Sequence, residues 1–105
     1  MVVFIKVNSR LAMLAAGLIG KPNAAIVVRN TIYLWGASRE VFLQDVQWVR
    51  HEVVHVLQYQ KYGVLLFWYL YLADSIRKGY LDNKFEREAR NFEKDRKILD
   101  GVTFR

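Results

Sequence analysis

The first part of the chain combines a strand-like run with a short helical pattern. Residues 1–7 are mostly β-branched and aromatic, which predicts a strand or an extended arm. Ser9 is then placed to cap a short helix that continues to about Leu18 and ends at Gly20, with Pro22 just beyond. We therefore expect a strand followed by a short helix.

A β-hairpin is expected next. Residues 25–28 and Thr31–Trp35 are strand-like runs, and only Arg29 and Asn30 separate them. Because asparagine tolerates the positive φ of tight turns, this spacing favours a hairpin. Apolar residues such as Ile32 would bury one face of it.

Helical patterns account for most of the remaining chain. The predicted helices are 39–62, capped by Ser38 and ended by Gly63; 64–78, ended by Gly79; and 84–99, capped by Asp82 or Asn83. We see no internal repeat, linker or low-complexity segment. Together these patterns predict a helix-dominated α+β fold with a small β-hairpin or sheet, in which residues 1–105 form a single domain.

Composition agrees with one folded domain and excludes thiol chemistry. Hydrophobic residues make up 53% and aromatic residues 14% of the 105 residues, enough to bury one core but not two. Cysteine is absent. Any metal site must therefore use histidine and carboxylate ligands.

The positive charge does not indicate a nucleic-acid partner. A net charge of +6 and a pI near 9.8 are compatible with binding to phosphates. However, the densest basic region, residues 77–97, alternates basic with acidic residues at helical spacing. This pattern indicates a solvated helix face with ion pairs, so we expect no nucleic-acid partner.

Two apolar segments resemble membrane signals. Residues 64–73 are apolar but cover roughly half of the ~20 residues needed to span a bilayer, so we expect a buried helix and no transmembrane segment. Residues 11–20 are not followed by a clear cleavage pattern, so no signal peptide is expected and a cytoplasmic location is slightly favoured. Peripheral membrane contact stays open, through an aromatic surface formed by Phe67, Trp68, Tyr69 and Tyr71.

The residues with the clearest chemistry lie midway along the helix predicted at 39–62. They form the motif HExxH, from His51 to His55. A spacing of four residues stacks both imidazoles on one helix face, where they can bind a single Zn²⁺. Glu52 lies about one hundred degrees round the helix, where its carboxylate can act as general base toward a metal-bound water.

The alternative is that these side chains merely decorate a partly buried helix. Both histidines of the chain fall in the motif, which favours a metal site. A separate apolar surface for packing is expected from Val49, Val53, Val56 and Leu57. Gln58 follows His55 by three residues and is a candidate hydrogen-bond partner for the site, with an exposed or core-bonded glutamine as the alternative.

A third metal ligand must come from outside the motif, because hydrolytic zinc sites use three protein ligands and one open position. Downstream carboxylates are the expected source, and Glu86 and Glu88 are the candidates. Glu86 also has structural interpretations: it makes a capping-box pattern with Asn83, and it can pair with Arg90 at i,i+4. Spacing alone leaves the choice open.

HExxH followed by a helix and an Asn-x-x-Glu-x-Glu-Ala segment resembles the gluzincin zinc metallopeptidases, particularly the very small minigluzincins. The similarity spans about residues 31–91. In several gluzincin families the glutamate three residues before a small alanine is the third ligand, which here selects Glu86, with Ala89 as the alanine. Relatives often continue with an acidic residue that hydrogen-bonds a histidine, whereas this chain has Arg90.

The resemblance implies a zincin-like metallopeptidase that cleaves peptides or unstructured proteins. Its zinc ligands would be His51, His55 and Glu86, and its general base Glu52. In such folds the strand before the active-site helix pairs with extended substrate, so Thr31–Trp35 would bind peptide by β-addition. The alternative is a hairpin that only covers the core.

Two further expectations concern the surroundings of the site. Tyr80, in the loop before Glu86, is a candidate oxyanion donor, with an ordinary buried tyrosine as the alternative. The rival to a peptidase is a latent or non-catalytic zinc-stabilised binding module, whose site is covered by the C-terminal tail, residues 99–105. The sequence does not indicate an oligomeric state.

Overall fold

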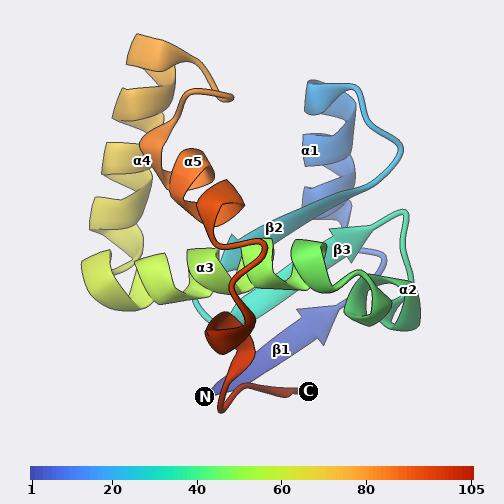
Figure 1. Ribbon diagram of the computed structural model, residues 1–105. Helices are drawn as coiled ribbons and strands as arrows, with labels where there is room; N and C mark the ends of the chain where they lie inside the picture. The colour runs from blue at the N-terminus through green and yellow to red at the C-terminus, as the bar shows by residue number, and fades with distance from the viewer.

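A small mixed sheet joins the two ends of the chain (Figure 1). The computed structural model describes residues 1–105. Its strands are β1 (Val2–Lys6), β2 (Ala24–Val28), β3 (Thr31–Trp35) and β4 (Thr103–Phe104), in the order β2-β3-β1-β4. β1 pairs in parallel with β3 and β4, whereas β2 and β3 form the predicted antiparallel hairpin. β3 is therefore a central strand, and β2 is an edge strand.

The hairpin is confirmed, but the predicted role of its asparagine is wrong. Arg29, not Asn30, has the positive φ, at 57°. The Asn30 carbonyl accepts a hydrogen bond from the Phe4 amide at 2.8 Å, and its side chain donates to the Val2 carbonyl at 3.4 Å. Asn30 therefore connects the hairpin to β1.

The first helix, α1 (Arg10–Ile19), agrees with its predicted caps. The Ser9 side chain accepts a hydrogen bond from the Ala12 amide, and Gly20 ends the helix in the left-handed conformation. α1 packs against β2 and β3 through its small buried residues Ala12 and Ala16. Small side chains on this face allow the helix to approach the sheet closely.

The long helix predicted at 39–62 is two helices. α2 (Arg39–Gln44) ends and α3 (Val46–Tyr62) begins at Asp45, whose carboxylate accepts a hydrogen bond from the Trp48 amide at 3.2 Å. Aspartate bonds to nearby backbone amides in this way at helix starts, and here that bond begins a new helix. The break lets the buried Phe42 pack edge-on against Trp48.

α3 lies across the sheet (Figure 1) and contributes four residues to the buried core, as many as the sheet does. Val49, Val53 and Val56 are almost fully buried and form one cluster with sheet residues such as Ile32. The prediction that Leu57 belongs to the same packing surface is wrong, because Leu57 is 37% exposed. The valines occupy the sheet-facing side of α3, which leaves the histidines free to face another element.

α4 (Val64–Lys78) extends away from the C-terminal end of α3, and the chain after it returns to α3 (Figure 1). Gly63 precedes α4, and Gly79 ends it; both adopt a positive φ with ψ near 165°, a backbone region that only glycine occupies readily. The predicted aromatic surface on α4 is not formed. Phe67 is buried, Trp68 and Tyr71 are half-buried beside it, and only Tyr69 is exposed.

The last predicted helix, 84–99, is also shorter than expected. α5 (Lys84–Asn91) ends early, and a turn leads to the 3-10 helix η1 (Arg96–Leu99), which is capped by the Asp95 side chain. The chain then adds β4 beside β1. The whole is a helix-dominated α+β fold with a small mixed sheet, as predicted. No helix has the length and apolar character needed to cross a bilayer.

Candidate metal centre

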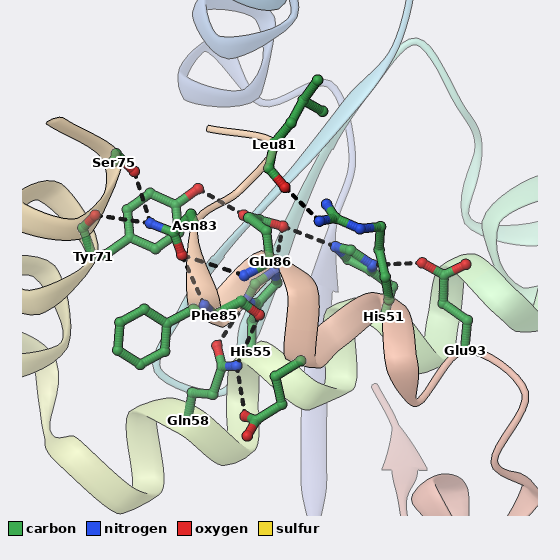
Figure 2. A network of polar contacts seen from close by, with 12 residues as sticks. His51, His55, Gln58, Tyr71, Ser75, Leu81, Asn83, Phe85, Glu86 and Glu93 are labelled. Atoms are coloured by element: carbon green, nitrogen blue, oxygen red, sulfur yellow. Dashed lines mark hydrogen bonds and ion pairs between the residues drawn. The ribbon is translucent and has the colours of Figure 1, made fainter. Parts of the chain in front are cut away.

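The two histidines of α3 point toward one carboxylate of α5 (Figure 2). Their imidazole rings lie one helical turn apart, with centroids separated by 5.1 Å. Nε2 of His51 is 3.1 Å and Nε2 of His55 is 3.2 Å from the same atom, Oε1 of Glu86. The structure therefore brings together the three predicted ligands.

Glu86 is held in place by the cap of its own helix. Asn83 is fully buried, and its side-chain oxygen accepts hydrogen bonds from the amides of Phe85 and Glu86. Its side-chain nitrogen donates to the Tyr71 carbonyl and to Ser75 Oγ, which ties α5 to α4. Asn83, rather than Asp82, is the cap that positions Glu86.

Neither structural interpretation of Glu86 holds. A capping box would require its carboxylate to accept the Asn83 amide, but that amide donates to the Tyr80 carbonyl instead. An ion pair with Arg90 is also absent, because the Arg90 guanidinium donates to the Leu81 carbonyl. The Glu86 carboxylate is committed to the histidines and, through its second oxygen, to the hydroxyl of Tyr71, which donates to Oε2 at 2.6 Å.

The outer nitrogens of both imidazoles have acceptor partners. Nδ1 of His51 lies 2.9 Å from Oε2 of Glu93, and Nδ1 of His55 lies 2.8 Å from Oε1 of Gln58. The Gln58 side-chain nitrogen donates in turn to the Phe85 carbonyl and to Glu88. Both acceptors are oxygens, so each Nδ1 carries the proton in the neutral ring and each Nε2 presents a lone pair.

These contacts define a site that fits a small cation. Both Nε2 atoms lie within hydrogen-bonding distance of one carboxylate oxygen, and such contacts between lone pairs require a proton or a cation between the atoms. For zinc bonds of about 2.0–2.1 Å at tetrahedral angles, neighbouring ligand atoms lie roughly 3.3 Å apart. The distances of 3.1 and 3.2 Å from Glu86 to the imidazoles are close to this value.

Glu52 is a second acidic group near the histidines. His51, Glu52 and His55 each offer a ligand atom, all within 4.8 Å of one another, and this group could hold a metal ion. Glu86, unlike Glu52, hydrogen-bonds to both Nε2 atoms. Glu86 therefore stays the predicted third ligand, and Glu52 is a second carboxylate within reach of the histidines.

No protein-family model, curated protein or solved structure matches this chain.

The contacts of the site shift the pKa values of its groups in opposite directions. Burial alone would lower the pKa of both histidines. Contacts with Glu86 and the negative charge of Glu52 outweigh this effect, so the pKa of each histidine is raised, and the pKa of His55 reaches about 9. Burial alone would raise the pKa of Glu86, but hydrogen bonds from both histidines hold it well below its usual range. Burial raises the pKa of Tyr71, so its hydroxyl stays protonated and can donate to Glu86.

Glu52 lies on the wall of a cavity of about 720 Å³ that opens beside the histidines. Burial raises the pKa of its carboxyl group to about 7. A carboxyl group with such a pKa can both take and return a proton near neutral pH. The cavity is lined by α1, β2, α3, α4 and α5, with Phe67, Trp68 and Tyr71 forming an aromatic side.

The strand that borders this cavity is β2, not β3. Residues 24–27 line it, and β2 has an unpaired edge. Thr31–Trp35 was expected to bind peptide by β-addition, but it pairs with β2 on one side and with β1 on the other. That expectation is wrong, because a central strand has no free backbone groups to offer a substrate.

The C-terminal tail also lies elsewhere than expected. β4 pairs with β1 at the sheet edge opposite β2, and no residue after Glu93 lines the cavity. The tail therefore does not cover the site.

Tyr80 does border the cavity and is half exposed rather than buried. Partial burial and the nearby charges of Glu86 and Glu52 raise its pKa to about 12, so its hydroxyl remains a donor.

Two site residues were missed by sequence reasoning. Glu93 contacts Nδ1 of His51, and Tyr71, expected only as a surface aromatic, donates to Glu86. The sequence carried no signal for Glu93, because its contact with His51 depends on α5 ending at Asn91. Tyr71 carried no signal either, since its contact depends on how α4 packs against α5.

Proposed function

We propose that this protein is a zinc metallopeptidase of the gluzincin type. The observation that supports the proposal is the contact of His51 Nε2 and His55 Nε2 with the same atom, Glu86 Oε1, while both Nδ1 atoms contact oxygens on the other side of their rings. Two imidazoles and one carboxylate, with a position left open, are the ligand set of hydrolytic zinc sites. The motif HExxH and the segment around Glu86 support the same assignment.

Each side chain has a distinct task in peptide hydrolysis. Bound zinc supplies a Lewis acid that acidifies water and polarises a carbonyl group. His51, His55 and Glu86 would hold the ion, and Glu93 and Gln58 would fix the orientation of the imidazoles. Tyr71 orients Glu86 through its second oxygen.

Glu52 is the proposed general base. Its pKa of about 7 allows the carboxylate to accept a proton from an attacking water and to return it to the leaving amine. Tyr80 at the cavity wall is a proposed donor to the oxygen of the scissile carbonyl. An extended peptide would lie in the cavity along the free edge of β2.

The test compares zinc content with cleavage of an unstructured protein such as casein. The wild type should bind one zinc and cleave casein, whereas Glu52→Gln should keep its zinc and lose cleavage by roughly 10²–10⁴-fold. The exposed Glu40 of α2 provides the control, Glu40→Gln, which should match the wild type.

One outcome would reject the peptidase, and a second would reject its proposed mechanism. Zinc binding by the wild type without any cleavage would favour the non-catalytic zinc-stabilised module. Equal cleavage by Glu52→Gln and the wild type would remove Glu52 from the mechanism.

A further inference from the structure

One end of the molecule is unusually apolar. The C-terminal ends of α1 and α4, together with the loop after α4, form this end (Figure 1). Its exposed apolar side chains, here called the apolar tip, are Leu18, Ile19, Ile76, Tyr80 and Leu81. Leu18 and Ile76 are 88% and 85% exposed. All of them except Ile76 also line the cavity, so the tip surrounds its mouth.

The apolar surface continues along both helices, away from the core. On α4 four large apolar side chains are more than half exposed: Leu65, Tyr69, Leu72 and Ile76. They follow one another at spacings of four, three and four residues. On α1 the exposed leucines are Leu11, Leu14 and Leu18. Such spacings place each set on one helix face. A peptide bound in the cavity would not cover these outer faces.

The charges around the tip are almost all positive. α1 contains no acidic residue, and the one acidic residue of α4, Asp74, is buried, where it accepts the Lys84 amide and pairs with Lys78. Lys21, Arg77 and Lys78 are exposed beside the tip. Asp82, in the loop after α4, is the one exposed carboxylate there. By contrast, acidic and basic side chains are mixed across α5 and η1.

We propose that the apolar tip docks on an anionic phospholipid membrane, with the cavity mouth facing the lipid surface. Exposed leucine and isoleucine can enter the boundary between headgroups and acyl chains, while neighbouring lysine and arginine bind anionic headgroups. A second copy of the chain is a poorer partner, because a two-fold contact through the tip would bring the cations of both copies together.

Docking deepens the proposed function by specifying where the substrate lies. If the site is a peptidase, its substrates are peptide segments at or emerging from a membrane surface. This consequence rests on the proposed function, whereas docking itself requires neither zinc nor Glu52.

The test is sedimentation of the full chain with vesicles of phosphatidylcholine, with or without phosphatidylserine. We expect binding that depends on phosphatidylserine and weakens as salt is raised. The double variant Leu18→Glu/Ile76→Glu should bind roughly tenfold more weakly or worse. Its control, Val7→Glu/Val41→Glu, changes two exposed valines outside the tip and should bind like the wild type.

A second pair of variants tests the charge. Lys21→Glu/Arg77→Glu should weaken binding by at least roughly fivefold for each cation replaced. Arg96→Glu/Lys97→Glu makes the same change in net charge on η1 and should have a smaller effect.

Several results would overturn the proposal. These are the absence of phosphatidylserine-dependent binding, or equal losses in the tip variants and their controls. A concentration-dependent dimer that Leu18→Glu/Ile76→Glu dissociates, without vesicle binding, would assign the tip to self-association instead. Vesicle binding by Glu52→Gln equal to that of the wild type would support docking even if no peptidase activity exists.

Discussion

Glu93 accepts the Nδ1–H of His51 across 42 positions of the chain, at 2.9 Å. The contact forms because α5 ends at Asn91 and the chain then turns, which places Glu93 against α3 (Figure 2). In metal sites such a carboxylate fixes the tautomer of the histidine and raises its basicity as a ligand. Glu93 is therefore expected to contribute to metal binding without touching the metal.

This contact gives the first prediction. Glu93→Ala should weaken zinc binding by roughly 10–100-fold, because His51 loses the acceptor that orients it. Glu93→Gln should recover much of the affinity, since the amide oxygen can still accept the Nδ1–H. Zinc affinity, measured by competition with a chromophoric chelator, checks both. Asp100→Asn is the control, and affinities equal to the wild type in all three variants would show that Glu93 does not matter.

A second prediction separates the two glutamates that the sequence could not distinguish. Glu86→Gln should cost more zinc affinity than the roughly 10–100-fold typical of an outer hydrogen-bond partner, because it removes a ligand. Glu88→Gln should have a smaller effect, since Glu88 contacts the site only through Gln58. The same chelator assay compares them. A larger loss in Glu88→Gln would reverse the assignment.

The third prediction concerns pH. Before a metal binds, burial alone would lower the pKa of His55, but its contacts with Glu86 and the charge of Glu52 raise it to about 9. Zinc must displace this proton, so below that pKa its affinity should fall about tenfold per pH unit for each proton released. Affinity should therefore rise with pH up to about 9 and then level off.

Glu86→Gln provides the matched comparison for this pH dependence. Removing the carboxylate removes the interaction that raises the pKa of His55, so the affinity of the variant should level off at a lower pH. Calorimetry in buffers of different ionisation enthalpy measures the released protons directly. An affinity independent of pH in the wild type would contradict the proton competition.

Some of the site could be predicted from sequence because its geometry is local. The spacing of His51 and His55 is fixed by the helical repeat, and HExxH therefore predicts both ligands without knowledge of the fold. The side of α3 that carries the valines is fixed in the same way. Glu86 required the resemblance to a family, since Glu88 has an equally suitable local pattern.

Other features depend on contacts that no local pattern encodes. The helical pattern continues past Asn91, yet α5 ends there and Glu93 turns toward His51. The helical sequence pattern likewise continues through Asp45, but there the Asp45 carboxylate accepts a hydrogen bond from the Trp48 backbone amide and a new helix begins. Thr103–Phe104 has too few residues to show strand periodicity, and only its pairing with β1 makes it a strand.

The last prediction concerns the tail. If residues 102–105 inhibited the site, their deletion would raise activity. However, Thr103–Phe104 pairs with β1 at the sheet edge opposite β2, the strand that lines the cavity. The deletion removes the hydrogen bonds from Thr103 N to Met1 O and from Arg105 N to Val3 O. It also removes the carbonyls of Phe104 and Arg105 that accept the guanidinium of Arg39.

Deletion should therefore lower the free energy of unfolding, by about 2–4 kcal/mol, through lost hydrogen bonds and the exposure of partly buried side chains. Zinc affinity and cleavage per folded molecule should stay unchanged, because no residue beyond Glu93 lines the cavity. Urea denaturation and the casein assay measure the two quantities separately. Phe104→Ala, which keeps the strand backbone, should lose less stability than the deletion. Higher activity after deletion would instead support a latent enzyme whose tail reaches the site in a second conformation.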